Sequence, residues 1–210
     1  RQQLIDFMKQ QGIGTCQTLT PRAIQAYREQ RGFFDSLNAY LENLYGRDWN
    51  VLPERFRKEP KKTNRWGRVG IEFATPNWTP TVTVGFLYDE RDHKVQLVDP
   101  DKSIDLLLRL EVGTEELPNP DPLLDILRKK AAKLDRPDQP VFVRGDPRNG
   151  NNHTLFLAHA SLAKVIEGKN ERHEQLAVIY KRLHGWCLEL FEDGPLDNAL
   201  KESFDAKKGC

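Results

Sequence analysis

The pattern of apolar and polar positions is clearest in the middle of the chain, between residues 66 and 99, where it repeats every second residue. A period of two is typical of a strand that buries one face and leaves the other polar. One face of the central segment consists of Val82, Val84, Phe86 and Tyr88. The pattern predicts a short antiparallel β-meander with strands at 68–73, 81–88 and 94–98.

Outside this region the apolar positions recur every three or four residues, which is the period of an amphipathic helix. Helices are predicted at 20–45, 121–134, 154–167 and 171–192. A short strand is predicted at 140–144, and the segment 104–112 fits either a helix or a strand. The combination indicates an α+β fold, in which the meander packs against several amphipathic helices, above all those at 20–45 and 171–192.

The length of the chain, 210 residues, suits a single α+β domain, which we predict over residues 1–195. Within it we expect a basic arm at 55–68, a sheet at about 68–98 and a helical C-terminal part at 121–192. Residues 196–210 are predicted to form a weakly structured tail.

Composition indicates a globular protein of a reducing compartment. Charged residues make up 30% of the chain, and no apolar run approaches the ~20 residues that a membrane helix needs. No secretory leader opens the sequence, and the three cysteines, Cys16, Cys187 and Cys210, are too widely spaced for a disulfide framework. We therefore expect a cytoplasmic location and no membrane partner. The chain begins with Arg1 rather than Met, so further domains of a longer chain are expected partners.

Charge is distributed unevenly, and this asymmetry points to an anionic partner. The net charge is +1, but residues 1–70 hold 13 Lys and Arg against 7 Asp and Glu. Much of the excess lies in the basic arm, where cations can neutralise phosphates and an aromatic ring can stack on a base. The candidate nucleic-acid-binding residues are Arg55, Arg57, Lys58, Lys61, Lys62, Arg65, Trp66 and Arg68. The alternative is a solvated loop whose aromatic residues, Phe56 and Trp66, are anchored in the core.

Candidate catalytic residues are few, and the sequence contains no cofactor motif and no metal-ligand set. Arg148 and His153 have the R-x4-H spacing that resembles the catalytic pair of the HEPN ribonucleases, but that family is all-helical. Asp138, Glu167 and Lys169 imitate a metal-dependent nuclease motif, although Glu167 falls on a helical pattern rather than a strand. We therefore expect neither a metal nor another cofactor.

Part of the chain resembles the C-terminal accessory region of bacterial PD-(D/E)XK nuclease-like proteins, many of them tied to restriction or phage defence. The segment Arg31–Leu37 resembles the helix with an aromatic pair in that region, while Trp66–Phe73 and Thr83–Tyr88 resemble its strands. The likeness covers about residues 20–112. It implies that the catalytic carboxylates and lysine would lie upstream, so no residue of this chain inherits a catalytic role.

These observations favour a non-catalytic accessory or recognition module, associated with DNA or RNA, of a larger bacterial nuclease or defence protein. Two alternatives remain open from the sequence. One is a small nuclease, either HEPN-like or metal-dependent. The other is a scaffold that binds only protein.

Overall fold

The computed structural model describes residues 25, 28–29, 31–32, 35–36, 38–39, 52–56, 60–65, 68–74, 80–88, 97–98, 104–112, 120–148, 153–192 and 194–205. The chain divides into two units, Arg1–Leu37 and Asn38–Cys210. In the first unit the described positions are helical, as predicted, and are stabilised along the helix by an ion pair between Arg31 and Asp35. All the remaining elements belong to the second unit.

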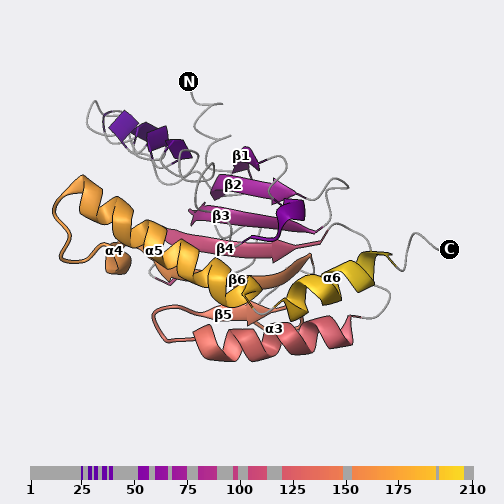
Figure 1. Ribbon diagram of the computed structural model, residues 1–210. Coiled ribbons are helices and arrows are strands. Elements are labelled where there is room, and N and C mark those ends of the chain that lie inside the picture. The colour runs from indigo at the N-terminus through magenta and orange to yellow at the C-terminus, as the bar shows by residue number, and fades with distance from the viewer. Residues whose placement is uncertain are drawn as a thin grey trace, which may run out of the picture. The chain divides into compact units, whose positions relative to one another are not determined.

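The second unit is built on a six-stranded antiparallel sheet (Figure 1). Its strands lie side by side in the order β1-β2-β3-β4-β6-β5, so β1 and β5 are the edges and the last strand in the sequence is an inner one. Every neighbouring pair is antiparallel. The strands are β1 (Pro60–Arg65), β2 (Arg68–Ala74), β3 (Thr81–Leu87), β4 (Asp105–Glu111), β5 (Val141–Val143) and β6 (Thr154–Ser161).

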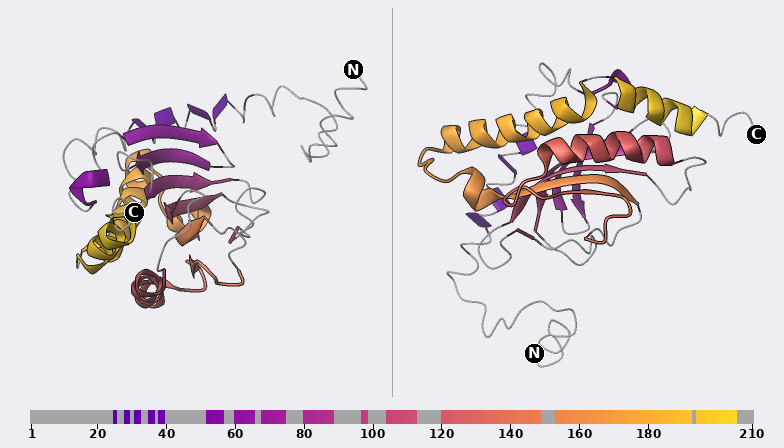
Figure 2. Two further views of the ribbon diagram at one scale, coloured as in Figure 1. Left: turned by 90° about the vertical axis from the view of Figure 1, so that its right-hand side faces the viewer. Right: turned by 90° about the horizontal axis from the view of Figure 1, so that it is seen from below.

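Helices cover one face of this sheet, as the two further views show (Figure 2). The sheet side of this interface is apolar, with Val84, Phe86, Leu108 and Phe156 all fully buried. Among the helices that the structure describes, none combines the length and the apolarity that crossing a bilayer requires. The helical elements are η2 (Glu54–Phe56), α3 (Asp121–Leu134), α4 (Leu162–Val165), α5 (Arg172–Phe191) and α6 (Pro195–Asp205).

The predicted fold class is confirmed: an antiparallel sheet packs against amphipathic helices. Strands β2 and β3 coincide with the segments predicted at 68–73 and 81–88, and the ambiguous segment 104–112 is strand β4. Strand β4, rather than the predicted strand at 94–98, pairs with the free side of β3. Of that predicted strand only Leu97 and Val98 are described, and neither is in a strand.

Two predictions for the C-terminal part are wrong. The predicted helix at 154–167 is strand β6 followed by the short helix α4. Every residue of β6 is buried, so its sequence TLFLAHAS lacks the alternation of a half-exposed strand. The predicted weakly structured tail contains helix α6, whose Leu196 and Leu200 are fully buried one turn apart.

Part of the basic arm at 55–68 belongs to the sheet rather than to a loop. Residues 60–65 form the edge strand β1, which joins β2 in a tight hairpin. The register pairs Lys61 with Glu72 and Arg65 with Arg68. Because successive strand residues project to opposite faces, Lys61 and Lys62 project to opposite sides of the edge strand.

Candidate functional site: a buried polar face of the sheet

The face of the sheet turned away from the helices carries an unusual number of buried polar side chains. We call these residues, together with the partly exposed Glu111, the polar face: Thr63, Arg68, Glu72, Thr81, Thr83, Asp105, Arg109, Thr154, His159 and Ser161. Arg68 is only 2% exposed and Arg109 only 3%. Charged residues are almost never buried to this extent unless they are paired, so the pairing of these groups decides what the face can do.

The charged groups of the polar face form one connected network with Glu111 at its centre. Glu111 Oε1 lies 3.1 Å from Arg68 Nη2, and Glu111 Oε2 lies 2.6 Å from Arg109 Nη2. Arg68 Nη2 is also 3.5 Å from Glu72 Oε2. Burial lowers the pKa of Arg109 to about 10, against the opposing effect of the nearby Glu111 carboxylate. The network balances two cations with two carboxylates.

A register shift in the sheet brings a further partner to this network. The pairing of β4 with β6 slips between Leu110 and Glu111, so that Glu111 lies opposite Thr154. Arg109 Nε then donates a hydrogen bond of 2.9 Å to Thr154 Oγ1. A register shift of this kind changes the direction of a side chain at the end of a strand. Here it provides the buried guanidinium of Arg109 with a hydrogen-bond partner.

A pair of glycines gives Arg68 the space to reach its carboxylates. Arg68 and Glu72 lie on one face of β2 with Gly70 between them, and Gly70 pairs with Gly85 of β3. A Cβ atom on Gly70 would lie 2.1 Å from the carbonyl oxygen of Val84. The two backbones therefore approach too closely for any side chain, and the Arg68 side chain extends along the strand past Gly70.

A second buried group joins Asp105 of β4 to His159 of β6. Asp105 Oδ2 lies 2.6 Å from His159 Nδ1, and it accepts a 2.9 Å hydrogen bond from the backbone N–H of Val98. Both side chains are fully buried. Ser161 lies opposite Asp105 in the register, so the three residue types of a hydrolytic triad are neighbours on this face.

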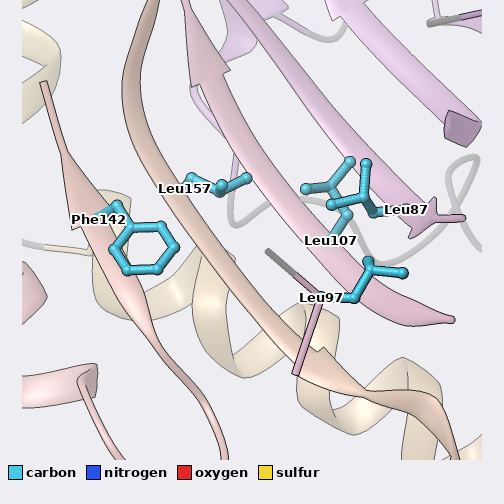
Figure 3. Close-up of a cluster of buried hydrophobic side chains, with 5 residues drawn as sticks. All are labelled: Leu87, Leu97, Leu107, Phe142 and Leu157. Carbon is cyan, nitrogen blue, oxygen red and sulfur yellow. The ribbon is translucent and has the colours of Figure 1, made fainter. Parts of the chain in front are cut away.

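The arrangement of these three residues is nevertheless not that of a triad. Within the described residues, neither Ser161 Oγ nor His159 Nε2 has a hydrogen-bond partner, so the hydroxyl is not bonded to the imidazole as nucleophilic catalysis requires. The surroundings are apolar, with the His159 ring 5.3 Å from the ring of Phe142. Beside it lies a cluster of buried side chains, drawn in Figure 3: Leu87, Leu97, Leu107, Phe142 and Leu157. Asp105 therefore serves to tie β4, β6 and Val98 together.

The structure separates the residues of the predicted basic arm. Lys61 and Lys62 are exposed on the edge strand β1. The assignment of Arg68 to an exposed cationic surface is wrong, because Arg68 is buried in the ion-pair network. The side chains of Arg55 and Arg65, and the whole of Arg57, Lys58 and Trp66, lie outside the described residues.

The predicted pair Arg148 and His153 is separated in the sequence by residues 149–152, which lie outside the described part of the chain. Arg148 is held by Asp146, through contacts of 3.1 Å from Nε and 2.8 Å from Nη2, and its guanidinium lies 4.6 Å from the centre of the Phe142 ring. These hydrogen bonds from Arg148 lower the pKa of the Asp146 carboxyl and raise that of Arg148 itself. His153 is exposed, just before β6.

Metal-ligand clusters are absent from the part of the chain that the structure describes. No three His, Cys, Asp or Glu residues there are grouped so that they could hold a metal ion. The chain matches no family model, and no curated protein or solved structure is significantly similar to it.

Cys187 offers a simple check of the core beneath α5. Its side chain is fully buried, and burial raises the pKa of the thiol well above its usual range. Since the thiolate is the reactive form, we expect Cys187 to resist iodoacetamide in the folded protein and to react after unfolding in urea. Mass spectrometry of a Cys16→Ser/Cys210→Ser variant measures this, and rapid labelling of the folded protein would contradict the buried position.

Sequence reasoning missed most of the polar face. It did not single out Arg109, Glu111 or His159. A signal was present in strand β4, where Arg109 and Glu111 interrupt the apolar run DLLLRLE at alternate positions. Charges spaced two apart inside an apolar strand lie on one face, and they indicate a buried partner of opposite charge.

Proposed function

We propose that this chain is a nucleic-acid-binding accessory module and that the outer edge of the sheet, at β1, is part of its contact surface. The observation that carries the proposal is the pair of exposed lysines, Lys61 and Lys62, on a strand with a neighbour on one side only. Lysines on an edge also prevent sheets from joining edge to edge, so the proposal needs a direct test.

The position of the lysines suits a sugar-phosphate backbone. Because Lys61 and Lys62 project to opposite sides of β1, a phosphate chain that follows the edge meets a cation on either side of the strand. The other cations of the basic arm adjoin this strand in the sequence. Contacts of this type neutralise phosphates and carry no base information, so we propose binding that depends on charge and little on sequence.

An accessory role without catalysis is supported by the burial or pairing of the side chains that are the best candidates for catalysis. Asp105, His159 and Ser161 are all fully buried. Arg148, the candidate from the R-x4-H pattern, is engaged by Asp146. We therefore propose that any cleavage belongs to other domains of a longer, nuclease-like chain, as the resemblance of residues 20–112 implies.

The test is fluorescence anisotropy with labelled single-stranded RNA, single-stranded DNA and duplex DNA at two salt concentrations. We expect Kd to rise steeply with salt, because each neutralised phosphate releases condensed counterion. Lys61→Glu/Lys62→Glu should weaken binding to all three probes by about tenfold or more. The matched control is Lys164→Glu/Lys169→Glu, two exposed lysines on and after α4, which should leave Kd within about twofold.

The alternatives give different results in the same experiment. A protein-binding scaffold would show no binding even at low salt, or binding that the reversal at β1 leaves unchanged. A nuclease would cleave the probes when Mg²⁺ or Mn²⁺ is added, and cleavage that disappears in His153→Ala would favour the HEPN-like reading.

A further inference from the structure

A groove beside helix α5 has the size and the lining of a small-molecule site. Its volume is about 530 Å³, within the range of roughly 300–1,000 Å³ that is usual for ligand pockets. Helix α5 supplies most of the wall, and the lining includes Val165, Val178, Lys181, Arg182, Gly185 and Trp186. We call this feature the α5 groove.

The polar groups of the α5 groove that remain available are hydrogen-bond donors. Trp186 is 2% exposed, and its indole N–H has no acceptor among the described residues. The side-chain amide of Gln139 is already used, because its oxygen accepts from Arg182 and its nitrogen donates to the carbonyl of Leu134 at 2.8 Å. The indole donor of Trp186 lies beneath the surface of the groove, so the groups that a ligand can reach are the side chains of Lys181 and Arg182.

The charge of the α5 groove also favours an anionic ligand. Lys181 and Arg182 contribute two cations to the wall. The carboxylate of Glu189, the acidic residue of the lining, lies 2.9 Å from Lys133 Nζ. The groove therefore carries excess positive charge over an apolar surface that includes Val165, Val178 and Trp186.

A glycine in the middle of α5 keeps the groove open. Gly185 lies on the wall, and a Cβ atom added there would meet nothing within 4 Å. Glycine inside a helix destabilises it relative to alanine, and packing at this position does not require it. The missing side chain leaves free space next to Trp186, on the same wall as Lys181 and Arg182.

We propose that the α5 groove binds a small amphipathic carboxylate. The apolar body of the ligand lies along Val165, Val178 and Trp186, over the space at Gly185. The carboxylate accepts hydrogen bonds from the cations Lys181 and Arg182. This binding site is separate from the edge strand β1 and does not depend on nucleic-acid binding.

The experiment titrates the ¹⁵N-labelled chain with sodium octanoate and follows the indole N–H signals of its four tryptophans by NMR. The Trp186→Phe variant identifies the Trp186 signal by its disappearance. We expect octanoate to move this signal saturably. Neutral 1-octanol should bind about tenfold more weakly, the factor for losing one charge-assisted hydrogen bond, and sodium acetate should not move the signal.

Three variants test the position of the ligand. Gly185→Leu fills the groove and should abolish the response to octanoate, whereas Ala177→Leu adds the same side chain at an exposed position of α5 outside the lining and should preserve it. Lys181→Glu, also exposed, should weaken octanoate and leave octanol unchanged. The proposal is overturned if octanoate leaves the Trp186 signal in place, if octanol binds equally well, or if Gly185→Leu, shown to be folded by its circular dichroism, still responds.

Discussion

Glu111→Ala is expected to lower the free energy of unfolding by about 3–5 kcal/mol, the loss typical of breaking a buried ion pair. Glu111 contacts both Arg68 and Arg109, at 3.1 Å and 2.6 Å, and both arginine side chains are at most 4% exposed. Removal of the carboxylate leaves two guanidinium groups in the interior with Glu72 as their remaining carboxylate. The penalty therefore comes mainly from uncompensated buried charge.

Urea denaturation followed by circular dichroism measures this loss. Glu111→Gln keeps the size of the side chain and should recover part of the stability, because its amide oxygen still accepts hydrogen bonds. The matched control is Asp125→Ala, which removes the carboxylate of an exposed ion pair with Arg128 at 2.8 Å. Exposed pairs contribute about 0–1 kcal/mol, so a Glu111→Ala loss as small as that of the control would argue against the buried network.

Gly70→Ala should strongly destabilise the sheet, with a loss of about 3 kcal/mol, the upper end of the usual range for overpacking. The added Cβ would lie 2.1 Å from the carbonyl oxygen of Val84 and 2.7 Å from the Cα of Gly85. Both obstacles are backbone atoms of a paired strand, so they cannot turn aside as a flexible side chain would. Relief requires β2 and β3 to separate locally, and it also crowds the path of Arg68.

Gly185→Ala is the matched control, and we expect it to stabilise the protein rather than destabilise it. It makes the same chemical change in α5, where the new Cβ meets nothing within 4 Å, so the helix should gain about 0.5–1 kcal/mol. Thermal unfolding of the two variants beside the parent chain compares them directly. Equal effects would contradict the close approach of Gly70 and Gly85.

A strand of the sheet could be predicted from the sequence only where its two faces differ in residue type. Val82, Val84 and Phe86 alternate with Thr81, Thr83 and Gly85, and this contrast revealed β3. Strand β6 offers no such contrast, because Leu155, Phe156, Leu157 and Ala158 are successive and all buried. A strand in the middle of the sheet, buried on both faces, resembles a buried helix in periodicity, which explains the wrong prediction.

The polar face was harder to predict because its partners come from distant parts of the chain. Arg68 and Glu111 are 43 residues apart, and Asp105 and His159 are 54 apart. Only the strand order and the register bring them together. Because the sequence does not reveal the register, Arg68 was predicted to bind together with the exposed lysines. In the hairpin of β1 and β2, Lys61 and Lys62 lie on the edge strand, whereas Arg68 lies in the interior.

The strand order has a consequence for the chain while it is being synthesised. Strands β1 to β4 follow one another along the sequence and can pair as soon as they emerge, but the other neighbour of β4 is β6, which is made only after α3 and β5. During this interval the apolar strand β4 is an unprotected edge. Exposed edges of this type recruit other chains, so aggregation during translation should be most severe when synthesis is interrupted between β4 and β6.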